Sequence, residues 1–162
     1  MLVMFRALIY ASLFVGFLFV YLPARLLSWS GIARPAEIQL PQIAGAFICA
    51  AGAVIALWCV GTFISLGKGT PAPFDPPRRL VVRGPYRFVR NPMYIGMALA
   101  LSGAALFYLS WPLLLYGCAL FVFSSLVVLV YEEPMLRKAF GEDYDNYCHS
   151  VRRWLPGLKA VR

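Results

Sequence analysis

The sequence predicts an all-α, polytopic membrane protein with about four transmembrane helices, a polar loop between the second and third helices, and an amphipathic helix at the C-terminus. Hydrophobic residues make up 61% of the 162 residues, and the mean hydropathy is +0.73. These values exclude an ordinary soluble domain. Apolar segments occur at residues 4–21, 43–66, 92–108 and 112–131. We expect residues 1–162 to form a single integral-membrane domain.

The four segments differ in how well their lengths suit a membrane. A hydrocarbon core of about 30 Å needs roughly 20 helical residues, so the second and fourth segments are comfortable spans and the third is short. In the first segment Arg6 precedes an apolar run in the manner of a secretory signal, but no convincing small-x-small cleavage site comes promptly after it. We therefore interpret it as a helix that ends at Leu22-Pro23.

Small residues on two segments predict close helix packing. Gly45, Cys49 and Gly52 are spaced by four and three residues, which places them on one face of the second helix. A stripe of the same period on the third helix consists of Gly96, Ala100 and Ala104. We expect the two stripes to meet.

The charges predict the topology. The net charge is +8, and the loop at 67–91 holds six basic residues and one acidic residue, whereas the connection at 109–111 has no charge. Positive-inside counting places this loop, the tail at 132–162 and both termini in the cytosol, most simply at an inner (cytoplasmic) membrane. Attraction of anionic lipid explains part of this charge. Nucleic-acid binding is not expected, because the charge is concentrated beside the membrane.

The connections bring distant polar groups together. Prolines and glycines at 67–85 exclude a helix, and Leu80 to Val82 favour an ordered loop over a flexible linker. A tight turn at Ser110 to Pro112 makes the last two spans an antiparallel hairpin, which returns Glu132-Glu133 to the side of Asn91 to Tyr94.

Beyond the hairpin the last helix is expected to continue to Phe140, where Gly141 stops it. An amphipathic segment, Glu142 to Trp154, follows. It would either lie in the membrane interface or close over the site. Its expected apolar face consists of Tyr144, Tyr147, Val151 and Trp154.

The stretch from Arg83 to Gly96 reads R-G-P-Y-R-F-V-R-N-P-M-Y-I-G. Its second half, Arg90 to Gly96, resembles the R-H-P-x-Y-x-G signature of the isoprenylcysteine carboxyl methyltransferase family, to which phospholipid N-methyltransferases are related. Glu132-Glu133, about forty residues later, matches that family's acidic pair. The resemblance covers about 67–156, including F-G-E-D-Y-D-N-Y at 140–147 and R-R-W-L-P at 152–156.

The resemblance implies transfer of a methyl group from S-adenosylmethionine to a lipophilic small-molecule or lipid acceptor, with 67–91 as a cytosolic cofactor-binding loop. Carboxyl O-methylation of an isoprenylcysteine-like substrate is the favoured reaction, and a phospholipid amine or small thiol is the alternative acceptor. The implied catalytic residues are Arg90, Asn91 and Glu133. The implied cofactor-binding residues are Arg79, Leu80, Val81, Tyr86, Asn91, Pro92, Tyr94, Gly96, Glu132 and Glu133. The implied substrate-binding residues are Arg152 and Arg153.

The chemistry of these residue types suits the cofactor. Adjacent glutamates on a helix point about 100° apart and cannot both face one atom. Together they could span an ammonium and a ribose hydroxyl, or one could hold cofactor while the other pairs with Arg137 at i+4. Arg90 could pair with the cofactor carboxylate or with a glutamate. Tyr86 and Tyr94 could offer hydroxyls, or ring faces to a sulfonium. Pro92 suits a helix's first turn, where the neighbouring free N–H groups favour an anion.

One residue departs from the family signature. Asn91 stands where histidine is usual, and an amide can form hydrogen bonds but cannot act as a base. A carboxylate acceptor needs no base, whereas an amine or thiol must lose a proton. Without a C-x-x-C pair or a histidine cluster, no metal site is expected.

Two other functions compete with the methyltransferase. A membrane reductase would bind a nicotinamide cofactor. However, no group of basic residues for the 2′-phosphate of that cofactor can be distinguished from the arginines that set the membrane topology. The other alternative is a non-catalytic scaffold or lipid-binding protein, in which Arg83 to Gly96 would be an ordinary membrane-proximal loop.

Overall fold

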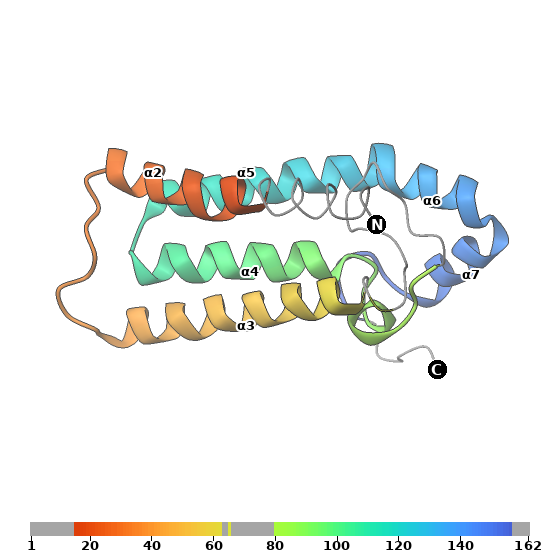
Figure 1. The fold of residues 1–162 in the computed structure, drawn as a ribbon, viewed down its shortest axis with the longest axis horizontal. Coiled ribbons are helices and arrows are strands. Elements are labelled where there is room, and N and C mark those ends of the chain that lie inside the picture. The colour runs from red at the N-terminus through yellow and green to blue at the C-terminus, as the bar shows by residue number, and fades with distance from the viewer. Residues whose placement is uncertain (1–14, 63–64, 66–79, 157–162) are drawn as a thin grey trace. The chain divides into compact units, whose positions relative to one another are not determined.

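A computed structural model describes residues 15–62, 65 and 80–156 (Figure 1). Within these residues all regular structure is helical and no strand occurs, which confirms the all-α prediction. In chain order the elements are η1 (Phe17–Tyr21), α2 (Leu22–Trp29), α3 (Leu40–Thr62), η3 (Gly84–Arg87), α4 (Pro92–Phe107), α5 (Trp111–Val127), η4 (Val128–Glu132), α6 (Glu133–Phe140) and α7 (Glu142–Ser150). Elements η1 and η4 are π-helices and η3 is a 3₁₀ helix.

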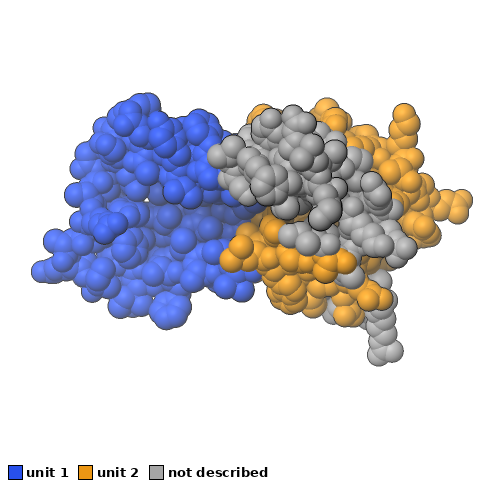
Figure 2. Space-filling model, viewed as in Figure 1, with its two compact units in different colours: residues 1–54, 96–122 blue, residues 55–95, 123–162 orange. Residues whose placement is uncertain are grey.

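The chain divides into two compact units, each built from two separate stretches (Figure 2). Unit 1 comprises residues 1–54 and 96–122, and unit 2 comprises residues 55–95 and 123–162. Unit 2 therefore joins the end of the polar loop to the acidic pair and the tail, as the hairpin argument predicts.

Among the described residues, two helices are long and apolar enough to cross a membrane. They are Leu40–Thr62, of 23 residues, and Trp111–Phe140, of 30 residues, in which α5, η4 and α6 are continuous. The apolar helices Phe17–Trp29 and Pro92–Phe107 are shorter, so the described residues support two of the four predicted spans by length. Large apolar side chains on the long helices are exposed, for example Phe47 at 74% and Val130 at 76%, which suits contact with lipid.

The first helix does not end where the sequence suggested. Of the expected span at 4–21, residues 1–14 lie outside the described part, and the helix continues through Leu22-Pro23 to Trp29. Pro23 lies in the first turn of α2, two residues after the π-turn of η1 ends at Tyr21. Proline there removes one N–H donor, and the altered bonding of the π-turn accommodates the loss without ending the helix.

Small residues bring α3 and α4 together within unit 1, as predicted (Figure 1). A Cβ added to Gly52 would meet the backbone of Gly96 and Ala100, and one added to Gly103 would meet the backbone of Gly45 and Cys49. The closest approach on α4 thus involves Gly103 rather than the expected Ala104. Only hydrogen side chains permit this separation, so the contact fixes how closely these helices pack.

The turn between α4 and α5 lies slightly earlier than expected. Leu109 has a positive φ of 48°, and the Leu113 N–H donates to Ser110 Oγ over 3.3 Å. Ser110 therefore caps the start of α5. Trp111 and Pro112, which we placed in the turn, are the first residues of the helix.

The tail of unit 2 follows the prediction closely at first. The helix that begins at Trp111 ends at Phe140, and Gly141 reverses the chain with a φ of +53°, a conformation that glycine adopts without steric cost. Helix α7 then ends at Ser150, earlier than the predicted Trp154. Its buried residues Tyr144 and Tyr147, with Val151 just beyond, confirm most of the predicted apolar face.

Candidate functional site

The predicted site residues of unit 2 come from three parts of the chain: the stretch 80–95, the junction of η4 with α6, and the tail around α7. Tyr144, Tyr147 and Val151 pack against Leu80, Val82, Leu136 and Phe140 in one cluster. Tyr147 donates its hydroxyl to the carbonyl of Tyr86 over 2.7 Å. The N–H of Arg90 donates to the carbonyl of Arg152 over 3.0 Å. The amphipathic segment therefore packs on the loop.

Buried tyrosines hold this docking in place. Burial raises the pKa of Tyr86, Tyr144 and Tyr147 above the ordinary tyrosine value. Their hydroxyls are consequently neutral at physiological pH, and Tyr147 serves as a hydrogen-bond donor to the loop. The tail and the loop thus pack together in one apolar cluster.

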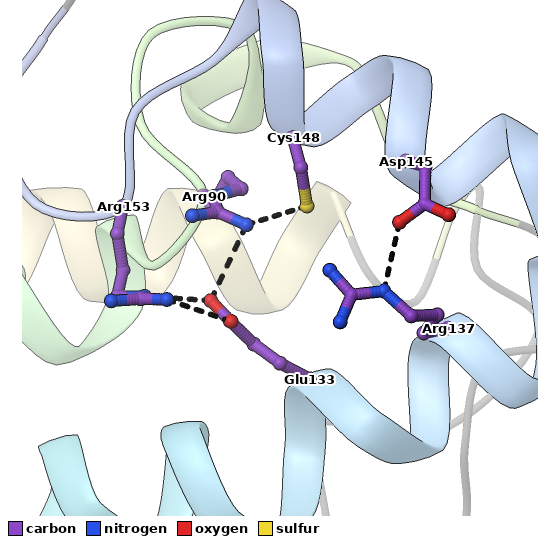
Figure 3. Close-up of polar contacts among 6 residues, drawn as sticks. All are labelled: Arg90, Glu133, Arg137, Asp145, Cys148 and Arg153. Atoms are coloured by element: carbon purple, nitrogen blue, oxygen red, sulfur yellow. Dashed lines mark hydrogen bonds and ion pairs between the residues drawn. The ribbon is translucent and has the colours of Figure 1, made fainter.

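Glu133 is the centre of the charged cluster (Figure 3). Its carboxylate accepts two hydrogen bonds from Arg153, from Nε over 2.7 Å and from Nη2 over 2.8 Å. Nη1 of Arg90 lies 3.3 Å from Oε1 of the same carboxylate, and the side chains of Arg90 and Glu133 are only 12% and 11% exposed. These contacts raise the pKa of Arg153. Two guanidinium groups thus enclose one carboxylate.

Glu132 has a different partner. Tyr94, in the first turn of α4, donates its hydroxyl to Oε1 of Glu132. The two adjacent carboxylates therefore face different groups, as their helical spacing predicts. The π-turn Val128–Glu132 immediately precedes α6, and single π-turns within helices are often associated with functional sites.

Two donors near the cluster have no partner among the described residues. They are Nε of Arg90 and Nδ2 of Asn91, and both are buried. Unpaired buried polar groups are uncommon in folded proteins and call for a missing partner such as water or a ligand. The carbonyl of Asn91 accepts from the N–H of Ile95, so Asn91 lies at the start of α4, where free N–H groups also favour an anion.

The remaining predicted residues have varied surroundings. Val81 is buried with Tyr86 and Cys59, and Met93 packs against them, whereas Leu80 belongs to the cluster around Tyr144. Pro92 is buried at the start of α4. Gly96 lies in unit 1, where its carbonyl faces Gly52. The side chain of Arg152 is exposed, and Arg79 lies outside the described residues.

One suggested pairing is wrong, and one contact was missed. Arg137 does not pair with Glu133 but donates to Asp145 of α7 over 2.8 Å, in an exposed position. Gly141 folds α7 back beside α6, which brings Asp145 within reach, while Arg90 and Arg153 occupy Glu133. Cys148 was missed: its sulfur accepts a hydrogen bond from Arg90. The one sequence signal near Cys148 is its position directly after Tyr147, which with Tyr144 marks the apolar face of the segment.

The arrangement suits a zwitterionic ligand. Arg90, Arg153 and Glu133 together carry one net positive charge and adjoin unpaired donors, while Glu132 offers a negative charge beside a neutral hydroxyl. An ammonium and a carboxylate on one molecule could be bound by these two sets of groups.

A family model described as phospholipid methyltransferase matches residues 40–143, well over half of the chain. The match includes both α3 and the acidic pair, and it ends before Tyr144, so Tyr147, Cys148 and Arg153 lie beyond it. No curated protein and no solved structure matches the chain.

Proposed function

Because the chain belongs to the phospholipid methyltransferase family of membrane methyltransferases, we propose that it transfers the methyl group of S-adenosylmethionine to a lipophilic acceptor taken from the membrane. The observation that carries this proposal is the charged cluster of unit 2, with its two separately bound carboxylates and its unpaired donors. The closer resemblance to isoprenylcysteine carboxyl methyltransferases remains a prediction.

The methionine end of the cofactor would bind at this cluster. Glu132 and Tyr94 would meet its ammonium, while Arg90, Asn91 and the first N–H groups of α4 after Pro92 would meet its carboxylate. Tyr86 and the segment 79–81 would contribute to the remainder of the cofactor site, and Gly96 would act through the packing of α4. Bound S-adenosylmethionine supplies an electrophilic methyl group, and the protein contributes chiefly by positioning the acceptor in a dry site.

The acceptor that best suits these residues is a carboxylate, as in an isoprenylcysteine-like lipid. Asn91 cannot take a proton, Glu133 is enclosed by two arginines, and Glu132 accepts the Tyr94 hydroxyl. A carboxylate acceptor has no proton to lose, so it needs none of these groups as a base. Arg152, whose side chain is exposed, would meet the acceptor's anionic group.

A phospholipid amine is the second candidate, because the matched family model carries that description. An ammonium must lose a proton before it attacks the methyl group. The dependence of the methylation rate on pH therefore separates the candidates: with an amine the rate rises toward the pKa of the ammonium, near 10 for a simple alkylamine, whereas with a carboxylate it is flat above about pH 6.

The experiment that tests the function is calorimetric titration of the detergent-purified protein with S-adenosylhomocysteine, with NADPH in parallel. We expect saturable binding of the first ligand only. Methyl transfer from labelled S-adenosylmethionine is then compared between a farnesylcysteine derivative and phosphatidylethanolamine vesicles. If a folded sample binds neither ligand, the methyltransferase proposal is wrong and the scaffold function takes its place. NADPH binding alone would favour the reductase.

We also propose the orientation. Charge counting favours cytosolic N- and C-termini at the inner membrane, with residues 67–91 and 132–162 on the cytosolic face. A C-terminal reporter that is active only in the cytosol tests this orientation, and a reporter active only outside would refute it.

A further inference from the structure

The geometry points to a specific role for Arg153, which the family match does not cover. We propose that Arg153 is a positioning residue of the cofactor site: it acts through Glu133 on Arg90, and it leaves Glu132 as the carboxylate that meets the positive charge of the ligand. This inference rests on the proposed function. It gives the two glutamates different roles: Glu133 pairs with arginines, and Glu132 meets the positive charge of the ligand.

Glu133 is already neutralised. Both of its oxygens accept hydrogen bonds from Arg153, and Arg90 lies 3.3 Å from one of them. The paired guanidinium–carboxylate geometry is bidentate, which is the strongest form of this interaction. A ligand ammonium placed against Glu133 would meet two positive charges for one negative charge. Glu133 is therefore a poor site for a cation.

Glu132 is the carboxylate that remains. Its hydrogen-bond partner, the hydroxyl of Tyr94, carries no charge. No arginine or lysine among the described residues forms an ion pair with Glu132. A cationic group of the ligand can consequently supply the missing counter-charge there, while Tyr94 fixes the orientation of the carboxylate.

Three contacts fix the path of the tail just before Arg153. Val151 is buried, the carbonyl of Arg152 accepts the N–H of Arg90, and Tyr147 donates to the carbonyl of Tyr86. The backbone of the tail is thus paired with the same residue, Arg90, that shares Glu133 with Arg153. The tail sets the position of Arg153 relative to Arg90 through the backbone as well as through the carboxylate.

Loss of Arg153 would change the surroundings of Arg90. Glu133 would then face Arg90 alone, and the guanidinium of Arg90 would turn to pair with both carboxylate oxygens, because that geometry is preferred. Such a turn would move Nε, the unpaired buried donor that lies next to Asn91 in sequence. The expected consequence is weaker binding of the ligand's amino-acid group, without any direct contact between Arg153 and the ligand.

The test is titration of the full-length protein with S-adenosylhomocysteine and, separately, with 5′-methylthioadenosine, which lacks the amino-acid group. The variants are Arg153→Gln, Arg153→Lys, Glu133→Gln, the double variant Arg153→Gln/Glu133→Gln, and Glu132→Gln. Arg137→Gln is the matched control, because it removes an arginine of α6 whose ion pair, with Asp145, is exposed. Melting temperature and gel filtration establish that each variant is folded.

We expect Arg153→Gln to weaken S-adenosylhomocysteine binding roughly tenfold or more and to leave methylthioadenosine binding unchanged. Lysine restores the charge but not the bidentate geometry, so Arg153→Lys should recover part of the loss. In the Glu133→Gln background, Arg153→Gln should add little further loss, since the two residues act in series. Glu132→Gln should weaken S-adenosylhomocysteine independently of both. In turnover, Arg153→Gln should raise KM for the methyl donor and leave KM for the acceptor unchanged.

Three results would overturn the inference. Unchanged affinity in a folded Arg153→Gln variant would show that Arg153 only anchors the tail. Losses that multiply in the double variant would show that Arg153 and Glu133 act separately. A rise in KM for the acceptor alone would assign Arg153 to the acceptor. Absence of binding to the wild-type protein would instead refute the proposed function itself, and this inference with it.

Discussion

Replacement of Gly103 by alanine tests the packing that underlies unit 1. A Cβ at this position would lie 2.6 Å from the carbonyl oxygen of Gly45 and 2.7 Å from Cα of Cys49. These are backbone atoms of α3, so the clash cannot be relieved by a change of rotamer, and the two helices must move apart. Overpacking of this kind costs about 1–3 kcal/mol, against which alanine returns about 1 kcal/mol of helix propensity.

Gly61→Ala is the matched control. Gly61 lies in α3, and a Cβ there would meet nothing within 4 Å, so this variant receives the propensity gain without the clash. We expect Gly103→Ala to be less stable than Gly61→Ala by about 1–3 kcal/mol. By the scaling for soluble domains of this size, each kcal/mol corresponds to about 2–4 °C in melting temperature. Thermal unfolding in detergent measures the difference, and equal melting temperatures would refute the close approach of α3 and α4.

Further predictions concern unit 2. Tyr94→Phe removes the hydroxyl that orients Glu132, so KM for the methyl donor should rise about tenfold; an unchanged KM would remove this pair from the site. Tyr147→Phe removes the hydrogen bond to the carbonyl of Tyr86 and should cost about 1–3 kcal/mol of stability at pH 7. Because burial raises the pKa of Tyr86, Tyr144 and Tyr147, stability is retained below about pH 10 and falls above it, by up to about 1.4 kcal/mol per pH unit for each tyrosine. Tyr147→Phe should make this alkaline loss less steep, and an equal slope would contradict the linkage.

The features that could be predicted from the sequence depend only on residues close together in the chain. Gly45, Cys49 and Gly52 recur at helical spacing, so their shared face follows from the geometry of any α-helix. The stop at Gly141 is equally local, because glycine adopts the positive φ observed there. The proline at position 23 misled the prediction because its effect depends on the π-turn before it, which no residue type specifies.

The contacts of the site were less accessible to sequence reasoning. The signature and the acidic pair identified Arg90, Tyr94, Glu132 and Glu133 as a group, and the structure brings them together within unit 2. Their pairing depends on the path of the tail after α7, where the chain is no longer helical and carries no period. Arg137 has the correct helical spacing for Glu133, yet Arg153 takes that carboxylate from twenty residues away.

The acidic pair shows that adjacent residues of one type can have different partners in the fold. Glu132 and Glu133 have the same side chain, but Glu133 forms bidentate hydrogen bonds with a guanidinium from the tail and Glu132 accepts a neutral hydroxyl from α4. An enclosed carboxylate stabilises the arginines that hold it, whereas a carboxylate beside a neutral donor keeps its attraction for an external cation. In the proposed site, the arginines around Glu133 would therefore provide the positive group and Glu132 the negative one. The difference arises because Arg153, which lies beyond the residues that the family model matches, supplies a counter-charge to Glu133 alone.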